Sequence, residues 1–299
     1  MRAAPDIKGV ALIAVSAASF ATLGVFGKLA YAEGLDLASA LFWRFAGAAL
    51  ALGLWLGLAG RGRITPRGAL LAFLLGAIGY ATQAALFFAA LQHAGASVVA
   101  LLLYLYPAFV VLLAWLVERD RPDRLRLTAL AAALAGSALT ADLAGGQIAP
   151  LGVTLGVGAA VWYSFYLTFG ARLVRTHDPV VTTALISTGA TITFALAATL
   201  SGGLMAPVTL PGWAALAGMA IIATALPIGA LFAGIARLGT PTAAILSTLE
   251  PVIAVALGIA LLGEVLNPRQ VLGAALVLAA ALALQRWSAA PTTPAAAAK

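Results

Sequence analysis

The residues Gly239–Glu264, GTPTAAILSTLEPVIAVALGIALLGE, form an apolar run long enough to cross the ~30 Å hydrocarbon core of a membrane. Near its middle the run carries a carboxylate, Glu250, followed at once by a proline, Pro251. A proline removes a backbone hydrogen bond and bends a helix, and a carboxylate at that depth is costly unless it faces protein or water. The stretch therefore predicts a bent spanning helix with its charge turned away from lipid.

An earlier stretch, Gly95–Glu118 (GASVVALLLYLYPAFVVLLAWLVE), has the same organisation. Its proline, Pro107, stands twelve residues after its first glycine, as Pro251 does after Gly239. A shift of 144 residues aligns 68–116 with 212–260 without a gap and gives twelve identities in 49 positions. The matched spacing from glycine to proline indicates that the chain contains an internal repeat.

The composition excludes an ordinary soluble domain. Hydrophobic residues make up 63% of the 299 residues and charged residues 9%, with a mean hydropathy of +1.05. The absence of cysteine excludes disulfides and thiol chemistry. The net charge of +7 does not indicate nucleic-acid binding, because the basic residues stand between apolar runs and not on one face or arm.

Ten apolar runs are separated by glycine, proline and charged residues, and most are near the ~20 residues of a spanning helix. They lie at about 7–30, 37–58, 68–91, 96–117, 125–141, 151–172, 180–201, 212–235, 240–262 and 269–287. We therefore predict an all-α polytopic membrane protein with ten transmembrane helices in two five-helix repeats (5+5), 1–144 and 145–287. Residues 288–299 are expected to be a disordered tail. Because five is odd, the repeats should insert in opposite orientations, with a binding site between them near the midplane.

The basic residues predict the orientation. The N-terminus, alternate loops and the C-terminus hold fourteen of the seventeen Lys and Arg, the opposite loops hold Lys28 and Arg269, and Arg44 lies within the second run. By the positive-inside rule both termini are cytoplasmic.

These features resemble the drug/metabolite transporter superfamily, in its ten-helix EamA-type branch. The resemblance rests on the 5+5 repeat, on the LEPV piece (Leu249–Val252) and the LLGE piece (Leu261–Glu264), and on Arg44 in the second run. Within the superfamily the chain is most similar to the YddG-type bacterial exporters of aromatic and other amino acids. The resemblance implies a bacterial inner-membrane location and a central cavity lined mainly by helices 1, 3, 4, 6, 8 and 9, with helices 5 and 10 peripheral. The first repeat departs from the pattern, because Tyr106 stands in the place of Glu250.

Motifs for enzymatic chemistry are missing from the sequence. The nearest approach to a phosphate-binding loop, Gly24–Leu29, lacks both the spacing and the hydroxyl. His93 and His177 fall at the ends of apolar runs, where a metal or proteolytic site within the membrane cannot be assembled. We expect neither an enzyme nor a bound metal or cofactor.

Polar and aromatic residues at midplane depth are the candidates for substrate binding. They are Tyr80, Gln83, Tyr104, Tyr106, Trp162, Tyr163, Tyr166, Ser247 and Glu250. Rings of this kind usually anchor helix ends, so a cluster in mid-helix favours a small-molecule cavity over simple packing. Helical spacing puts Tyr163 and Tyr166 on one face, whereas Tyr104 and Tyr106 should point apart, one of them into packing.

A second set of residues is assigned to structure or hinge function: Arg44, Pro107, Pro227 and Pro251. Two alternatives stay open for Glu250. It is either a proton-exchanging group or a permanently charged strut paired with Arg44, and the strut is slightly favoured because Tyr106 provides no second carboxylate. The glycine pairs Gly53/Gly57 and Gly152/Gly156 predict close helix packing within the chain first and dimer contacts second, in a monomer or weak homodimer.

The predicted function is export of amino acids, with aromatic or apolar ones favoured, or of similar small amphipathic metabolites by alternating access. Export of lipophilic cationic drugs is an alternative, because rings and a carboxylate also suit a cation. Sugar phosphates fit less well, because only Arg44 is available as a phosphate clamp. A non-transporting membrane receptor or scaffold is the alternative from another class, although it would not require an inverted repeat.

Overall fold

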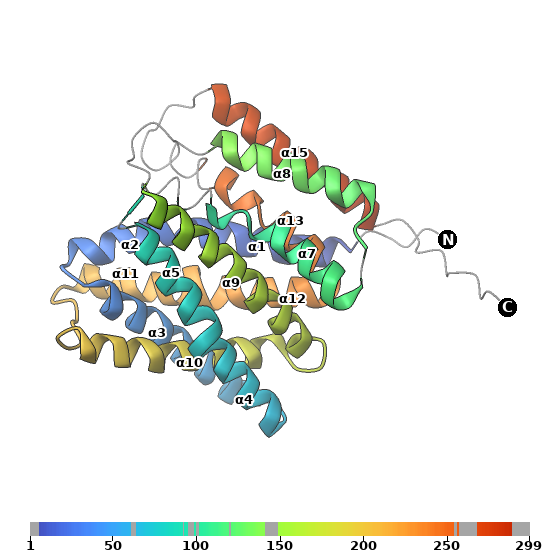
Figure 1. Cartoon of the computed structure of the whole chain (residues 1–299). Coiled ribbons are helices and arrows are strands. Elements are labelled where there is room, and N and C mark those ends of the chain that lie inside the picture. The colour runs from blue at the N-terminus through green and yellow to red at the C-terminus, as the bar shows by residue number, and fades with distance from the viewer. Residues whose placement is uncertain are drawn as a thin grey trace.

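The computed structural model describes residues 6–60, 64–91, 93, 94, 99, 102–119, 121–140, 149–253, 256 and 268–288. Throughout these ranges the long regular elements are helices packed into one bundle (Figure 1). The first residue of the predicted tail 288–299, Ser288, ends a helix, and the rest of that tail and the junction between the predicted repeats lie outside the described residues. The fold class is the predicted one, an all-α polytopic membrane protein of two repeats.

The first repeat begins with a broken helix. Its elements are α1 (Ile7–Ala21), α2 (Leu23–Ala32), α3 (Leu37–Leu58), α4 (Pro66–Leu74), the π-helical η1 (Leu75–Tyr80), α5 (Ala81–Leu91), α7 (Tyr106–Glu118) and α8 (Arg124–Thr140). α1 and α2 together match the predicted run 7–30, and α4, η1 and α5 form one continuous helix. The predicted span 96–117 begins within residues that are not described.

The second repeat has a similar order of elements, but its first helix is unbroken. They are α9 (Pro150–Val174), α10 (Pro179–Leu200), α11 (Leu210–Ala220), η2 (Ile221–Ala225), α12 (Leu226–Leu238), α13 (Thr240–Leu246) and α15 (Pro268–Ser288). After a turn at Ser247 and Thr248, residues 249–253 are helical again. A π-helical segment occurs at corresponding places in the two repeats, since η1 shifted by 144 residues overlaps η2.

Matching caps start the matching helices. Asp36 accepts a hydrogen bond from the Ser39 amide at 3.0 Å, and Asp178 accepts one from the Val180 amide at 2.7 Å. Thr65 and Thr209 likewise accept from amides three residues on, each at 3.1 Å. A side-chain oxygen at this position satisfies an amide that the helix leaves unpaired. The caps therefore fix equivalent helix starts in both repeats.

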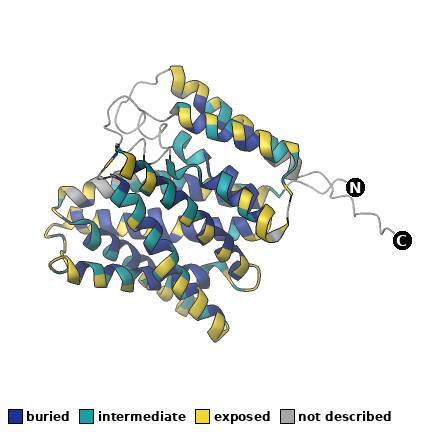
Figure 2. Ribbon diagram, viewed as in Figure 1, coloured by how far each residue is buried: buried dark blue, intermediate teal, exposed yellow. Residues whose placement is uncertain are grey.

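Five helices of the described part are long and apolar enough to cross a membrane, judged by length and composition. They are Leu37–Leu58, Pro66–Ala90, Pro150–Val174, Pro179–Leu200 and Leu210–Leu238. Of the other predicted spans, 7–30 is interrupted at Thr22 between α1 and α2, and 125–141 corresponds to the shorter helix α8. The outer faces of the bundle carry exposed leucines and other large apolar side chains, which suits contact with lipid (Figure 2).

The two repeats pack against each other through equivalent pairs of helices. α1 packs on α12 while its counterpart α9 packs on α5, and α3 packs on α11 while its counterpart α10 packs on α4. The counterparts α3 and α10 pack on each other, and so do α8 and α15. Figure 1 shows α8 and α15 along one edge of the bundle, the peripheral place that the resemblance implies for helices 5 and 10.

The glycine pairs differ in what they contact. A Cβ on Gly152 would meet Ala94 and His93, and one on Gly156 would meet Leu102, so this pair packs helices closely inside the chain as predicted. Among the residues that the structure describes, a Cβ on Gly53 or Gly57 would meet nothing within 4 Å. The expectation of internal packing is therefore wrong for Gly53/Gly57, because that end of α3 faces outward. Contact of this pair with a second chain stays a prediction.

Candidate functional site

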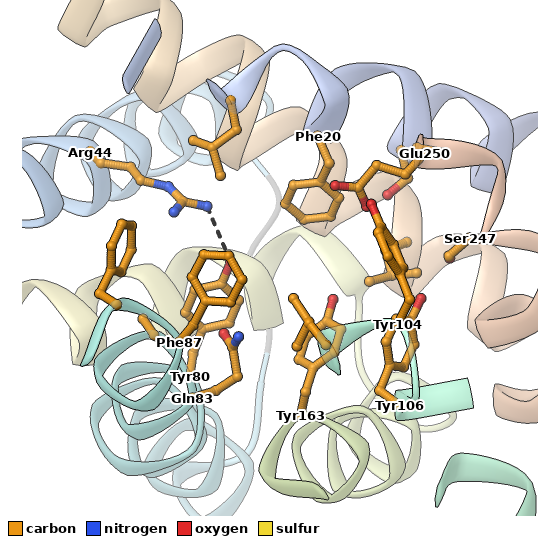
Figure 3. A pocket seen from close by; sticks show the side chains of 17 residues that line it. Phe20, Arg44, Tyr80, Gln83, Phe87, Tyr104, Tyr106, Tyr163, Ser247 and Glu250 are labelled. Carbon is orange, nitrogen blue, oxygen red and sulfur yellow. Dashed lines mark hydrogen bonds between the residues drawn. The ribbon is translucent and has the colours of Figure 1, made fainter. Parts of the chain in front are cut away.

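A cavity of about 140 Å³ lies among helices of both repeats. It is lined by Ser16, Ala17, Phe20, Leu23, Arg44, Tyr80, Gln83, Ala84, Phe87, Phe88, Leu103, Tyr104, Tyr106, Tyr163, Leu231, Ser247 and Glu250. Figure 3 shows rings and polar groups from several helices directed into this space. The lining residues come from all the spans that the resemblance implies (1, 3, 4, 6, 8 and 9). Arg44 adds the second predicted span, which is α3.

Seven of the nine predicted substrate-binding residues line this cavity. They are Tyr80, Gln83, Tyr104, Tyr106, Tyr163, Ser247 and Glu250. Tyr80 and Gln83 come from one face of the helix formed by η1 and α5, and Ser247 and Glu250 flank the turn after α13. The arrangement brings residues that are far apart in the sequence to one place.

Trp162 and Tyr166 lie away from the cavity wall. Trp162 is 36% exposed and lines an outer groove between α4, η1 and α9, together with Phe165 and Phe169. One residue along a helix turns the side chain by about 100°, so Trp162 faces outward while Tyr163 faces inward. Tyr166 is fully buried behind Tyr163, with ring centroids 5.7 Å apart, and supports the wall. Both residues must be removed from the predicted lining.

Tyr104 and Tyr106 both face the cavity, which corrects the expectation that one of them packs elsewhere. Tyr104 and Leu105 form a turn, and α7 starts only at Tyr106. A turn does not keep the 100° step of a helix, so two residues that would point apart on a helix converge here. The Tyr106 hydroxyl donates a hydrogen bond to the Ala244 carbonyl of α13 at 3.3 Å.

Arg44 is fully buried at one end of the cavity. Its Nε donates to the Thr224 hydroxyl at 2.7 Å, and its Nη2 donates to the Tyr80 hydroxyl at 3.1 Å. The guanidinium also lies over the Phe45 ring, 4.9 Å from its centroid, which stabilises a cation. Arg44 therefore joins α3 to the π-helical segments of both repeats, because Tyr80 ends η1 and Thr224 belongs to η2.

Glu250 lies across the cavity from Arg44, with the Tyr104 hydroxyl beside its carboxylate (Figure 3). The described residues show no ion pair between Arg44 and Glu250, so the predicted strut does not exist as a direct salt bridge. Each charge instead has hydroxyl groups as neighbours and faces the cavity. A basic and an acidic side chain thus face the same cavity.

A continuous series of rings connects the two ends. Phe45 contacts Tyr80 with centroids 5.2 Å apart, and Tyr80 contacts Tyr166 at 5.1 Å. Tyr163 follows on Tyr166, and Tyr106 contacts Tyr163 at 4.8 Å. Rings in such edge and stacked contacts fix one another's orientation, and the cavity wall is therefore built from packed aromatics.

The predicted hinge prolines stand at irregular places in the helices. Pro107 and Pro251 follow the turns at Tyr104–Leu105 and Ser247–Thr248, and Pro227 follows η2. The carbonyl of Pro227 accepts a hydrogen bond from the Ser16 hydroxyl of α1 at 2.8 Å. Neighbouring side chains thus contact the backbone near a proline, and hinge motion there stays a prediction.

Several cavity residues were missed by the sequence analysis, above all Ser16, Phe20 and Leu23 near the junction of α1 and α2. Their spacing of four and three residues is the pattern of a single helical face. A polar Ser16 on an otherwise apolar face was the signal that could have identified this wall. Phe87 and Phe88 carry no such signal, because apolar rings are ordinary in a membrane helix.

Comparison with known proteins supports the same organisation. The EamA-like transporter family matches this chain twice, over residues 7–141 and 150–285. The threonine/homoserine exporter RhtA of Escherichia coli, in strain K12 and likewise in strain O157:H7, is 32% identical over 134 residues. That alignment spans 44% of this chain and 44% of the length of RhtA.

A protein of known crystal structure superimposes with a TM-score of 0.75 at 20% identity, over 94% of this chain and 97% of that chain. At this level of identity the likeness shows the fold alone. The family, in contrast, covers nearly all of both repeats. The chain therefore belongs to the EamA-like transporter family of the drug/metabolite transporter superfamily.

Proposed function

We propose that the protein is a secondary transporter that exports amino acids or similar small amphipathic metabolites from a bacterial cytoplasm. The observation that carries this proposal is the cavity between the repeats, which presents one basic side chain, one acidic side chain and several rings. A site of this kind at the interface of inverted repeats is suited to alternating access, in which the halves rock around a bound molecule. RhtA, a relative over part of its length, is a threonine/homoserine exporter.

The size of the cavity supports a small substrate. Pockets for drug-sized molecules have volumes of roughly 300–1,000 Å³, whereas this cavity has about 140 Å³. This difference favours amino acids over the lipophilic cationic drugs that the rings and Glu250 alone would also suit. It also favours small side chains, so the expected preference for aromatic or apolar amino acids stays a prediction for the substrate panel.

The test is a counterflow assay with the purified protein in proteoliposomes. Vesicles loaded with unlabelled L-threonine, L-homoserine, L-valine or L-phenylalanine are expected to accumulate the same labelled amino acid, while protein-free vesicles do not. Accumulation of a labelled lipophilic cation in place of every amino acid would establish the drug-export alternative. Absence of exchange with either class would favour a receptor or scaffold.

We also propose an inner-membrane location with both termini in the cytoplasm, on the basis of the fourteen basic residues that share one side of the predicted topology. A reporter that is active only in the cytoplasm is expected to be active when it is fused after Lys299. A fusion that is active only in the periplasm would overturn this orientation.

A further inference from the structure

The two charged side chains that line the cavity lie on opposite walls. Arg44 belongs to α3 of the first repeat, and Glu250 follows α13 of the second repeat (Figure 3). The described part of the chain contains no salt bridge between them. A buried charge without an opposite charge in contact is costly. A molecule that carries both charges would therefore compensate Arg44 and Glu250 at once.

The Arg44 end fits a carboxylate. A guanidinium has five N–H donors in one plane, and the recorded hydrogen bonds from Nε and Nη2 both go to neutral hydroxyls. Among the described residues Nη1 has no recorded hydrogen bond, while Arg44 lines the cavity. Thr224 and Tyr80 hold the guanidinium in a fixed position. A fixed planar donor with unused N–H groups is the usual partner of a carboxylate.

The Glu250 end fits an ammonium group. Its carboxylate accepts hydrogen bonds, and the hydroxyl of Tyr104 lies beside it. Phe20 and Tyr106 also line this end of the cavity (Figure 3). Aromatic faces near a carboxylate attract a cation in addition to the charge itself.

We infer that the cavity binds an amino-acid zwitterion in one orientation, with the carboxylate on Arg44 and the ammonium on Glu250. This inference rests on the proposed function and adds the recognition chemistry to it. A lone cation compensates Glu250 but leaves Arg44 without a counter-charge and is repelled by it, and a lone anion does the reverse. The zwitterion alone satisfies both ends.

The orientation has a consequence for transport. The zwitterion has no net charge, and Arg44 and Glu250 together have none, so the loaded cavity contains balanced charges. Movement of the halves around the bound molecule then displaces no net substrate charge across the membrane. The side chain of the amino acid lies against the walls between the two ends, where Gln83, Phe87 and Tyr163 stand.

The test compares each transported amino acid with two analogues that lack one charge. For L-threonine these are L-threoninamide, which lacks the carboxylate, and 3-hydroxybutyrate, which lacks the amine. Counterflow of the labelled amino acid is measured with each analogue as competitor. We expect each analogue to compete about tenfold more weakly than the amino acid, because each loses a charge-assisted contact.

Two variants assign the ends. In Arg44→Gln the preference for the amino acid over its amide is expected to fall below about twofold, while the preference over the deaminated acid remains. In Glu250→Gln the opposite pattern is expected. Trp162→Phe, on the outer groove, is the matched control and keeps both preferences. Each preference is a ratio within one variant, so partial loss of active protein does not affect it.

The outcomes are distinguishable. If none of the four amino acids exchanges, the proposed function fails and this inference with it. If an amino acid exchanges but its amide or its deaminated analogue competes within about twofold in the unmodified protein, the inference alone is overturned. The comparison of analogues in the unmodified protein decides the matter even where a variant fails to fold.

Discussion

In the first repeat the chain turns at Tyr104 and Leu105 just before Tyr106, and in the second repeat it turns at Ser247 and Thr248, with Leu249 between the turn and Glu250. Tyr106 and Glu250 are equivalent under the 144-residue shift, and both face the cavity. The turn in the backbone thus occurs in both repeats. The side chain that it presents to the cavity carries a neutral hydroxyl in the first repeat and a carboxyl group in the second.

The same contrast holds for Arg44. Its counterpart in α10, at a shift of 142 residues, is the apolar Ile186, which is fully buried. The two hydroxyls that bind Arg44, from Tyr80 and Thr224, are themselves equivalent positions of the two repeats. A symmetric cavity would hold two like charges, which repel each other. The difference between the repeats gives one basic and one acidic side chain instead.

At the ends of the bundle, a capping threonine of each repeat contacts a side chain of the other repeat. The Thr209 hydroxyl donates to Glu33 at 2.7 Å, and the equivalent Thr65 hydroxyl lies 3.2 Å from Nε2 of His177. Each threonine caps its own helix and contacts the loop of the other repeat. The repeats therefore share a scaffold, and they differ in side chains at the cavity and at the two ends.

Breaking the shared scaffold is expected to have the largest effect. Gly189 and Gly47 are equivalent, but a Cβ on Gly189 would meet the Phe73 carbonyl and the Ala77 amide, whereas one on Gly47 would meet the Ala220 side chain. We expect Gly189→Ala to destabilise the protein by about 3 kcal/mol and Gly47→Ala by about 1 kcal/mol. Thermal unfolding of the purified variants measures this, with outward-facing Gly53→Ala as control. Equal melting temperatures for Gly189→Ala and Gly53→Ala would contradict the packing described.

Removing the single carboxylate is expected to affect transport more than stability. Because Glu250 forms no ion pair with Arg44 in the described chain, Glu250→Gln should keep a melting temperature within a few degrees of the parent and lose about tenfold or more in transport. Tyr106→Phe, at the equivalent position, loses a 3.3 Å hydrogen bond and should be affected less.

Measuring melting temperature and uptake driven by a pH gradient together also separates two roles of Glu250. Loss of driven uptake with exchange retained would indicate a proton-exchanging group. A large drop in melting temperature would restore the strut hypothesis.

Two neighbours on α9 sharpen the description of the wall. Tyr163→Ala should reduce transport about fivefold, more for bulky apolar substrates than for small polar ones, because a ring contact contributes about 1 kcal/mol. Trp162→Ala should leave transport at the parental rate, because its ring lines the outer groove. Similar losses in both variants would mean that the wall is wrongly assigned.

Two buried tyrosines are expected to respond with opposite signs. Tyr80→Phe removes an acceptor from Arg44 and should destabilise by about 1–3 kcal/mol, since a buried donor loses its partner. The Tyr166 hydroxyl is buried and has no hydrogen-bond partner in the part of the chain that the structure describes, so Tyr166→Phe should melt at the same temperature or higher. A loss of stability in Tyr166→Phe would show that its hydroxyl has a partner in the membrane.

The smallest expected effect concerns the end of α1. The pKa of Asp6 lies below its usual value of 3.8. The main cause is the hydrogen bond from the Gly9 amide, and the second is Arg237, which lies 3.0 Å from the Asp6 carboxylate. The stabilisation is therefore present above that value and is lost as the pH falls through the lowered pKa. Asp6→Asn, which keeps the cap, should lower stability by less than about 1 kcal/mol at neutral pH. A difference from the parent that persists at pH 2 would contradict the ionic origin.

The sequence predicts the five long spans Leu37–Leu58, Pro66–Ala90, Pro150–Val174, Pro179–Leu200 and Leu210–Leu238 because a helix that crosses a membrane needs a long apolar run. The sequence does not predict the π-helical segments, because they share no proline signal. The segment η1 contains no proline, whereas η2 is followed by Pro227. Spacing alone also misplaces residues wherever a helix stops, as at Tyr104.

Packing decides the remaining differences. Tyr163 and Tyr166 share a face, yet only the tertiary contacts with Tyr80 and Phe232 put Tyr166 behind the wall. The pair Gly53/Gly57 has the same spacing as Gly152/Gly156, but which of them meets another helix depends on the arrangement of the whole bundle. Contacts of this kind are not visible in a local pattern.

Protection of the cavity by substrate tests the central claim most directly. The chain contains no cysteine, so Ala84→Cys introduces a single thiol at the cavity wall, and Ser201→Cys introduces one at an exposed turn as control. A saturating amino acid that the vesicles transport is predicted to slow maleimide labelling of Ala84→Cys about tenfold and to leave Ser201→Cys unchanged. Labelling of Ala84→Cys at the same rate with and without that amino acid would place the transport site elsewhere.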